Sequence, residues 1–251
     1  MSEPTYNKHR ARRAFVQRHV GLPRNVLEIG ALNAPLFGND TVVKYADRFG
    51  RDELLERYPH KVKNVPRVDY VLTSHKFADD IHETFHCIVA NHVVEHVPDL
   101  INWFDQLAKV SEPDGWIVLA VPDKRYTFDI IRPLTTMADV VDCAHRELAS
   151  PSVGQIFAHL YMYRKVNTQD IWDGKPVDVS QPRMQIDKAV RKALAMGEEY
   201  HSVHCHVFTC DSFRQLFDEL FRANLIDWVV QAYEEPLPSS NEFLVALKRA
   251  R

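Results

Sequence analysis

The stretch VLEIG, residues 26–30, decides the fold. An apolar run that ends in an acid, an apolar residue and a glycine is typical of a buried strand that stops at a ligand-binding turn. A second apolar run, VVKYA at residues 42–46, ends at Asp47, seventeen residues beyond Gly30. An acid that closes the second strand of an α/β unit can accept hydrogen bonds from both hydroxyls of a ribose. The two runs therefore predict a site for a nucleoside-containing ligand.

The turn after the first run indicates which nucleoside. Residues 31–35 read Ala-Leu-Asn-Ala-Pro, so only the first glycine of the dinucleotide signature G-x-G-x-x-G is present. That signature lets a pyrophosphate touch bare backbone at a helix N-terminus. S-adenosylmethionine carries no phosphate, and its site needs only a close turn beside the amino-acid moiety. The pattern therefore favours S-adenosylmethionine over NAD.

Strands and helices alternate along the rest of the chain, which predicts a parallel sheet covered on both faces. Further strand-like runs lie at 68–72, 86–90 and 116–121, and the turn residues 112–115 are expected to end a helix over 100–110. Apolar residues at helical spacing predict another helix around 213–221. The runs 226–233 and 243–248 then predict a C-terminal hairpin.

Three segments resemble, in family order, motifs of the class I S-adenosylmethionine-dependent methyltransferases. VLEIGALNAPL (26–36) looks like a degenerate first motif, KYADR (44–48) like the second, and CIVANHVVEHVPD (87–99) like the strand and turn written vLEHv-D. The nearest branch is the UbiE-like, or type 11, branch, in a subgroup that also carries PDKRYTFD (122–129). Members of that subgroup often accompany polysaccharide genes.

The resemblance implies a Rossmann-like, doubly wound α/β sheet of seven strands, mostly parallel with one antiparallel strand, plus a helical cap insertion. Residues 1–123 and 207–251 are expected to form the core, with an N-terminal entry helix, and residues 124–206 the insertion. Helices are expected in it near 136–149, 153–164 and 185–196. Because the insertion follows the fifth strand, it should emerge at the ligand-binding edge of the sheet and cap the substrate.

The resemblance also implies a set of cofactor-binding residues around the first, second and fourth strands. Asp47 is expected on the ribose, and the turn at the end of the first strand beside the methionine moiety. The expected set is Glu28, Gly30, Ala31, Asp47, Arg48, Asn91 and His92.

Methyl transfer from a sulfonium is an in-line displacement, which requires positioning and, for an oxygen acceptor, removal of a proton. In related enzymes the pair that matches Glu95 and His96 faces the reaction centre. Asp123 and Arg125, just past the fifth strand, suit a polar or anionic acceptor, and Asp123 is the first choice for an acceptor-facing group. The alternative is that these two residues pair with each other or cap the insertion.

The segment HSVHCH, residues 201–206, is the other candidate catalytic cluster. If it is extended, His204 and His206 lie on one side and Cys205 on the other. The two histidines could act as a general base, bind the acceptor, bind a metal with Glu95 or Asp123, or pack under the cap. The cluster lacks a matched second ligand pair, so the sequence assigns no metal.

The segment His92-x-x-Glu95-His96 also spells the H-x-x-E-H signature of inverted zincins. Such a site needs both histidines and the glutamate on one face of a stable helix. Since His92 directly follows a strand, the sequence disfavours a zinc peptidase.

The chain opens with a basic cluster ahead of an apolar run, which predicts the entry helix. The cluster is either a phosphate-binding patch or, as is commoner for charge runs on short helices, a solvated face. In related folds such a helix often lies over the cofactor. Its members are Lys8, His9, Arg10, Arg12 and Arg13.

Bulk properties indicate an ordinary cytoplasmic enzyme. A chain of 251 residues with 45% hydrophobic content can bury a sizeable core, and a net charge of −3 argues for neither a nucleic-acid nor a membrane partner. No apolar run approaches the roughly 18 residues that span a bilayer. The four cysteines form no C-x-x-C pair, so reduced thiols are expected. A homo-oligomer is left open.

We therefore expect an S-adenosylmethionine-dependent methyltransferase that acts on a small-molecule or sugar-derived acceptor, at oxygen rather than nitrogen. Two alternatives stay open. The missing second glycine would suit a repurposed, non-catalytic S-adenosylmethionine-fold binding protein. A metal-dependent enzyme would use Glu95, His96, His204 and His206.

Overall fold

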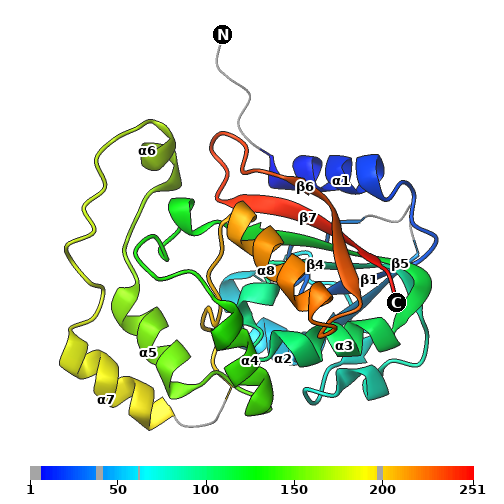
Figure 1. Cartoon of the computed structure of the whole chain (residues 1–251), viewed down its shortest axis with the longest axis horizontal. Helices are drawn as coiled ribbons and strands as arrows, with labels where there is room; N and C mark the ends of the chain where they lie inside the picture. Colours follow the sequence, from blue (N-terminus) through cyan, green and yellow to red (C-terminus); the bar gives the residue numbers. More distant parts are fainter. Residues whose placement is uncertain (1–6, 38–41, 62, 197–199) are drawn as a thin grey trace.

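The computed structural model of the chain describes residues 7–37, 42–61, 63–196 and 200–251. Its centre is a seven-stranded sheet in the order β3-β2-β1-β4-β5-β7-β6 (Figure 1). The strands are β1 (Val26–Ile29), β2 (Val43–Asp47), β3 (Tyr70–Val71), β4 (Phe85–Asn91), β5 (Ser111–Pro122), β6 (Trp228–Glu234) and β7 (Glu242–Arg249). Strand β7 pairs antiparallel with both β5 and β6, and the other strand pairs are parallel. The predicted doubly wound, Rossmann-like sheet with one antiparallel strand is confirmed.

The central strands are apolar throughout because both of their faces are covered. In β4, Ile88 and Ala90 belong to the core on one face of the sheet, whereas Cys87 and Val89 belong to the core on the other face. This alternation follows from the two-residue repeat of a strand. The sheet is therefore the middle layer of three.

Helices form the two outer layers and a lobe beside them (Figure 1). The α-helices are α1 (Lys8–His19), α2 (Arg51–Arg57), α3 (Leu100–Lys109), α4 (Met137–His145), α5 (Val153–Met162), α6 (Thr168–Trp172), α7 (Ile186–Met196) and α8 (Cys210–Arg222). In the described ranges they are accompanied by the short 3₁₀ helices η1 (Pro59–Lys61), η2 (Phe77–Asp80), η3 (Val94–His96) and η4 (Lys124–Tyr126). Capping boxes at Thr136, Ser152 and Thr209 start α4, α5 and α8.

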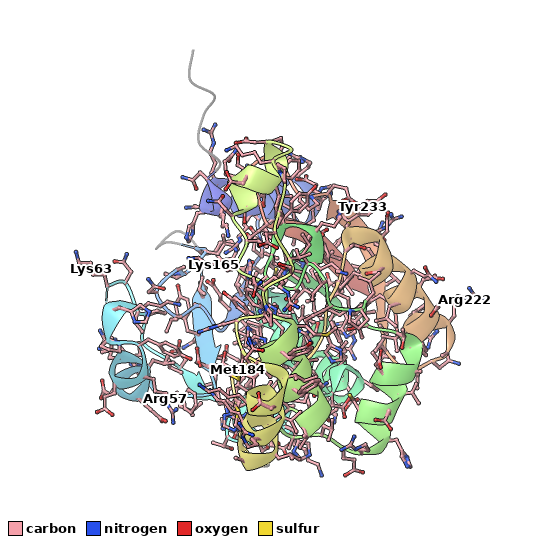
Figure 2. All side chains as sticks on the ribbon, turned by 90° about the vertical axis from the view of Figure 1, so that its left-hand side faces the viewer. Arg57, Lys63, Lys165, Met184, Arg222 and Tyr233 are labelled. Atoms are coloured by element: carbon pink, nitrogen blue, oxygen red, sulfur yellow. The ribbon has the colours of Figure 1, made fainter. Side chains whose placement is uncertain are left out.

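The predicted insertion divides between the layers and the lobe. Helix α4 packs against α3 and α8, and its Val140 is buried in the main core. Helices α5 and α7 instead pack against each other around a small separate core that includes Ile156 and Ala193. In the view that faces this lobe, Lys165 and Met184 mark the segments that connect its helices (Figure 2).

Several predicted boundaries differ from the structure. Residues 112–115 do not end a helix: α3 ends at Lys109, and these residues form a bulge in β5, where Phe85 pairs with Ser111 but Cys87 pairs with Trp116. The strand expected at 68–72 shortens to the two residues of β3. Helices α2 and α6 have no more than two turns each, too short for a periodic signal.

The cysteine expectation is confirmed, since all four cysteines are free and buried. Within the described part of the chain, every helix is too short or too polar to cross a membrane.

Candidate cofactor and acceptor site

A cavity of about 710 Å³ lies at the carboxyl ends of β1, β2 and β4. This volume suits a small organic ligand, and the position is where open α/β sheets bind them. The cavity wall includes most of the predicted cofactor residues and one of the predicted catalytic ones: Gly30, Ala31, Asp47, Arg48, Asn91, His92 and His96.

The floor of the cavity is the turn after β1. Gly30 has a φ of +69°, and a Cβ on it would lie 2.7 Å from Cγ2 of Val93, so no larger residue fits without a shift. Leu32, where the family carries its second glycine, also has a left-handed φ of +46°. The turn therefore keeps a backbone conformation that favours glycine even though one glycine is missing.

Glu28 does not line the cavity, so its predicted direct contact with the cofactor is corrected. It is buried, and both of its carboxylate oxygens accept the backbone N–H of Leu36, at 2.8 and 3.0 Å. Burial raises the pKa of Glu28 to about 7. Its role is to hold the segment that follows Gly30 against the end of β1.

Asp47 and Arg48 form the side of the cavity at the end of β2. Burial raises the pKa of Asp47 to about 6. Hydrogen bonds from the backbone N–H groups of Phe49 and Arg48 oppose this shift but do not cancel it. A carboxylate that has lost hydration gains from new hydrogen-bond donors such as hydroxyls. The Arg48 guanidinium lies 4.1 Å from the ring centre of Tyr200, which connects this side to the insertion.

His92 is held at the opposite side of the cavity, with a φ of +56°. Its Nε2 lies 2.6 Å from Oε2 of Glu242 on β7, and Arg12 of α1 donates to both oxygens of the same carboxylate, at 2.9 and 2.6 Å. Burial alone would raise the pKa of Glu242, but the hydrogen bonds from His92 and Arg12 lower it to about 2. The carboxylate is therefore ionised at neutral pH.

Neither interpretation of the basic cluster in α1 holds for all of its members. Arg12 is buried on Glu242, and Lys8 donates to Oδ1 of Asn241 at 2.8 Å. Both line the cavity with His9, so α1 lies over the predicted cofactor site. Arg10 and Arg13 are exposed, as the solvated-face interpretation expects, and His9 is exposed as well as lining the cavity.

Glu95 and His204 meet His96 beside the cavity. Nε2 of His96 and Nε2 of His204 lie 3.9 and 4.0 Å from Oε1 of Glu95. Burial lowers the pKa of His96, and the nearby Glu95 opposes the shift. Asp129 holds His204 from behind, with Oδ2 2.6 Å from Nδ1. Burial alone would raise the pKa of Asp129, but the hydrogen bond from His204 and the charge of Arg132 lower it overall.

The expectation that His204 and His206 lie on one side of a strand is wrong. The backbone N–H groups of Cys205 and His206 both donate to the carbonyl of Glu95, at 2.6 and 3.1 Å, so the segment turns around that oxygen. The His206 ring instead stacks near Phe208, with ring centres 6.1 Å apart. Burial lowers the pKa of His206 to about 4.

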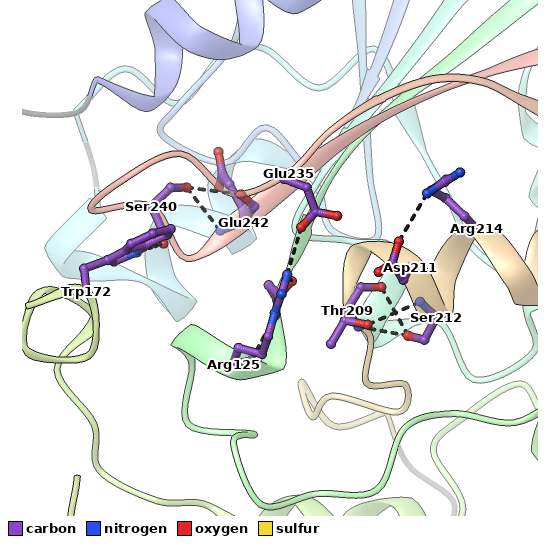
Figure 3. A network of polar contacts seen from close by, with 10 residues as sticks. Arg125, Trp172, Thr209, Asp211, Ser212, Arg214, Glu235, Ser240 and Glu242 are labelled. Carbon is purple, nitrogen blue, oxygen red and sulfur yellow. Dashed lines mark hydrogen bonds and ion pairs between the residues drawn. The ribbon is translucent and has the colours of Figure 1, made fainter. Parts of the chain in front are cut away.

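Asp123 is not the acceptor-facing group, because it is fully buried and bonded to Arg125. The guanidinium donates to both of its oxygens, at 2.9 and 2.7 Å, and the backbone N–H of Arg125 donates to Oδ1. Arg125 also donates to Glu235 in the loop between β6 and β7 at 2.9 Å (Figure 3). Neither Asp123 nor Arg125 lines the cavity. The pairing alternative is the one observed.

The sequence matches the family model of the methyltransferase domain over residues 6–220. The chain belongs to the methyltransferase domain family. Family membership confirms that this protein is a methyltransferase and that its cofactor is S-adenosylmethionine. No match was found among curated proteins.

Solved structures similar to this methyltransferase include three bacterial proteins. The 1,6-didemethyltoxoflavin-N1-methyltransferase of Burkholderia thailandensis is 13% identical, with a TM-score of 0.47 over 97% of this chain and 78% of that one. The N-methyltransferase NodS of Bradyrhizobium japonicum is 11% identical, with a TM-score of 0.46 over 98% and 90%. A methyltransferase of Mesorhizobium loti is 15% identical, with a TM-score of 0.46 over 96% of each chain. At these values they say nothing about the acceptor.

Sequence reasoning missed several residues that shape the site of this methyltransferase. Glu242 carried no local signal, because its partners Arg12 and His92 are distant in the chain, and Arg12 was visible only as one member of the basic cluster. Asp129 is the last residue of PDKRYTFD, so its position was visible but its role was not. Tyr200 completes the cavity wall from the insertion.

Proposed function

We propose that this methyltransferase transfers the methyl group of S-adenosylmethionine to a hydroxyl oxygen of a small-molecule or sugar-derived acceptor. The observation that carries the proposal is the pair of His92 and Glu242 at the cavity wall. Because Glu242 is ionised at neutral pH, it accepts the proton of His92 Nε2. In the neutral ring, Nδ1 of His92 then keeps the lone pair that a general base needs.

A base of this kind suits oxygen better than nitrogen. An alcohol holds its proton until the transition state, whereas a neutral amine attacks with its own lone pair. The acceptor oxygen bonds to the methyl carbon as the carbon–sulfur bond breaks, and the bonding pair goes to sulfur. The hydroxyl proton passes to Nδ1 of His92. A histidine oriented by a carboxylate is a recurrent arrangement for activating a hydroxyl nucleophile.

The proposed placement of the cofactor follows the cavity wall. Asp47 accepts the ribose hydroxyls, the turn at Gly30 and Ala31 holds the methionine moiety, and the acceptor lies toward His92. The PDKRYTFD segment and its resemblance to the UbiE-like subgroup favour a sugar-derived acceptor. Helices α5 to α7 are proposed as the cap over that acceptor.

The test is a transfer assay with methyl-labelled S-adenosylmethionine, offered to a panel of hydroxylated sugars and phenols and to the matching amines. We expect label in a methyl ether. The variant His92→Gln should lower kcat by roughly 10²- to 10⁴-fold, which is the usual contribution of a general base. Its Kd for S-adenosylmethionine should stay near that of the wild type.

His145→Gln is the matched control, because His145 is an exposed histidine at the end of α4. Label on nitrogen, or an unchanged kcat in His92→Gln, would contradict the proposal. Calorimetry that detects no binding of S-adenosylmethionine or of its demethylated product would instead support the repurposed binding protein.

A further inference from the structure

The Glu95 carboxylate is the least satisfied polar group beside the cavity. The residue is buried, with 1% of its surface exposed. Neither carboxylate oxygen accepts a hydrogen bond from any residue in the described part of the chain. Leaving a buried carboxylate without hydrogen bonds is costly, so such a group indicates a partner that is not part of the polypeptide.

Histidine nitrogens surround this carboxylate. Oε1 of Glu95 lies 3.6 Å from Nδ1 of His92, 3.9 Å from Nε2 of His96 and 4.0 Å from Nε2 of His204. One ligand atom each of Glu95, His96 and His204 can be chosen so that all three lie within 4.8 Å of one another. The three side chains therefore converge on one point.

The remaining contacts fix which ring nitrogen of each histidine carries the hydrogen in the neutral form. Nδ1 of His96 lies 3.0 Å from the carbonyl oxygen of Val203, and Nδ1 of His204 lies 2.6 Å from Oδ2 of Asp129. Each Nδ1 faces an acceptor, so in the neutral imidazole it carries the ring hydrogen, and each Nε2 presents a lone pair. In that form three electron-pair donors face one another, an arrangement that a cation between them would stabilise.

Further contacts hold the donors in place. Arg132 donates to Oδ1 of Asp129 at 2.8 Å, and the backbone N–H of His204 donates to Nδ1 of His159 at 3.1 Å. A carboxylate or carbonyl behind each imidazole is the arrangement that orients histidine ligands in metal sites.

We propose that Glu95, His96 and His204 bind a divalent transition-metal ion at the wall of the cofactor cavity. Two imidazole nitrogens and one carboxylate oxygen suit zinc and its neighbours, whereas magnesium and calcium prefer oxygen ligands alone. The donors must close to roughly 3.3 Å from one another around metal bonds of about 2.0–2.1 Å. His206, which the sequence grouped with these residues, lies outside the site.

The position of the site suggests what the ion does, and this step rests on the proposed function. Three protein ligands leave a coordination position open, and His96 lines the cavity, so that position is accessible to an acceptor. A hydroxyl bound there has a lowered pKa. Its proton passes to His92, and the oxygen then takes the methyl group from sulfur. The ion would thus both hold and activate the acceptor.

Metal binding is testable without an acceptor. The full chain, freed of metal by a chelator, is titrated with Zn²⁺ against a chromophoric competitor and with Co²⁺ by absorption spectroscopy. We expect about one ion per chain. Glu95→Gln and His96→Ala should each weaken binding by roughly tenfold or more. Asp129→Asn, which keeps all three ligands but alters the support of His204, should weaken it by roughly 10- to 100-fold.

His145→Ala is the matched control and should bind both ions as the wild type does. Circular dichroism checks that each variant is folded, and His96→Ala keeps the test decisive if Glu95→Gln does not fold, because His96 is partly exposed on the cavity wall. The proposal is overturned if the wild type binds neither ion, or if folded Glu95→Gln and His96→Ala bind as tightly as the wild type.

The two proposals fail in different ways. Methyl transfer to oxygen by a chain that binds neither ion would leave the proposed function standing and remove the metal site. One bound ion together with methyl transfer to nitrogen alone would keep the metal site and contradict the proposed function.

Discussion

The turn after β1 shows how single residues define the cofactor site. Gly30 and Leu32 both adopt left-handed backbone conformations, but only Gly30 faces a neighbour so close that a Cβ would collide with it. Leu32 tolerates its conformation at a cost of about 1 kcal/mol or more. The turn therefore accepts Leu32 at the position of the second glycine, whereas Gly30 cannot be replaced without a shift of the backbone or of Val93.

Gly30→Ala should destabilise the protein by about 1–3 kcal/mol, because the new Cβ combines an unfavourable φ with the contact to Val93. Cofactor affinity should fall with it, since the turn must shift. Urea unfolding and calorimetry measure the two effects. Gly154→Ala in α5 is the control, because its Cβ would approach only Oγ of Ser152, at 3.8 Å. Equal behaviour of the two variants would contradict this assignment.

The ionisation of Asp47 should set the pH dependence of cofactor binding. Its pKa is raised to about 6, and only the ionised carboxylate can accept both ribose hydrogen bonds. Binding therefore releases the proton that Asp47 carries at low pH. Affinity should be full above pH 6 and fall as the pH drops through it, by up to roughly tenfold per unit.

Asp47→Asn should weaken S-adenosylmethionine binding by roughly 1.5–3 kcal/mol at neutral pH and flatten this dependence. Calorimetry across the pH range measures both. If the affinity of Asp47→Asn falls at low pH as that of the wild type does, the titration belongs to another group.

At the scale of elements, one carboxylate connects three of them. Glu242 at the start of β7 binds Arg12 of α1 and His92 after β4, so the entry helix is fastened to the sheet directly over the cavity. At the surface, Arg125 of η4 donates to Glu235 and so connects η4 to the loop that joins β6 to β7. These contacts position the elements that enclose the site.

Glu242→Gln should lower the free energy of unfolding by about 3–5 kcal/mol, because it leaves the buried Arg12 without its counter-charge. The lowered pKa of Glu242 means that its contribution is present above the unfolded pKa near 4.5 and is lost as the pH falls toward about 2. Urea unfolding at neutral and acidic pH should therefore show a difference from the wild type that shrinks in acid.

Glu235→Gln is the control for that variant, because Glu235 is about half exposed in its pair with Arg125. It should cost at most about 1 kcal/mol, as surface ion pairs do. A loss at Glu242 no greater than the loss at Glu235 would show that the buried carboxylate does not fasten α1.

At the scale of the whole molecule, the cavity is closed by parts that are far apart in the sequence. Arg48 follows β2, and Tyr200 follows α7 and the lobe, yet the guanidinium and the ring stack against each other. The segment that follows the lobe thus contributes to the wall of the cavity. Its position should affect how quickly the cofactor leaves.

Tyr200→Ala should accelerate the dissociation of S-adenosylmethionine, because it removes a cation–π contact worth about 0.5–2 kcal/mol. Tyr200→Phe keeps the ring and should behave like the wild type. Stopped-flow displacement of a fluorescent cofactor analogue measures the rates. An Ala variant as slow as the Phe variant would show that this contact does not retain the cofactor.

The sequence by itself determined where the strands lie along the chain, the burial of the central ones and the edge of the sheet at which the cavity lies. These features depend on local patterns, since an apolar run ending at Gly30 or Asp47 places that residue at the carboxyl end of a parallel strand. Residues next to those ends, such as Arg48 and His92, are carried to the cavity by the same rule. The family motifs are also local patterns, so they identified S-adenosylmethionine-dependent methyl transfer from the sequence.

Only the tertiary structure decided which side chains face one another. Asp123 stood at the correct edge of the sheet but lies bonded to Arg125 away from the cavity, and His206 packs apart from His204 although it is two residues away. His92 meets Glu242 across 150 positions of sequence. Such pairs depend on how distant elements pack, and a local pattern of residues carries no information about a partner that only folding brings near.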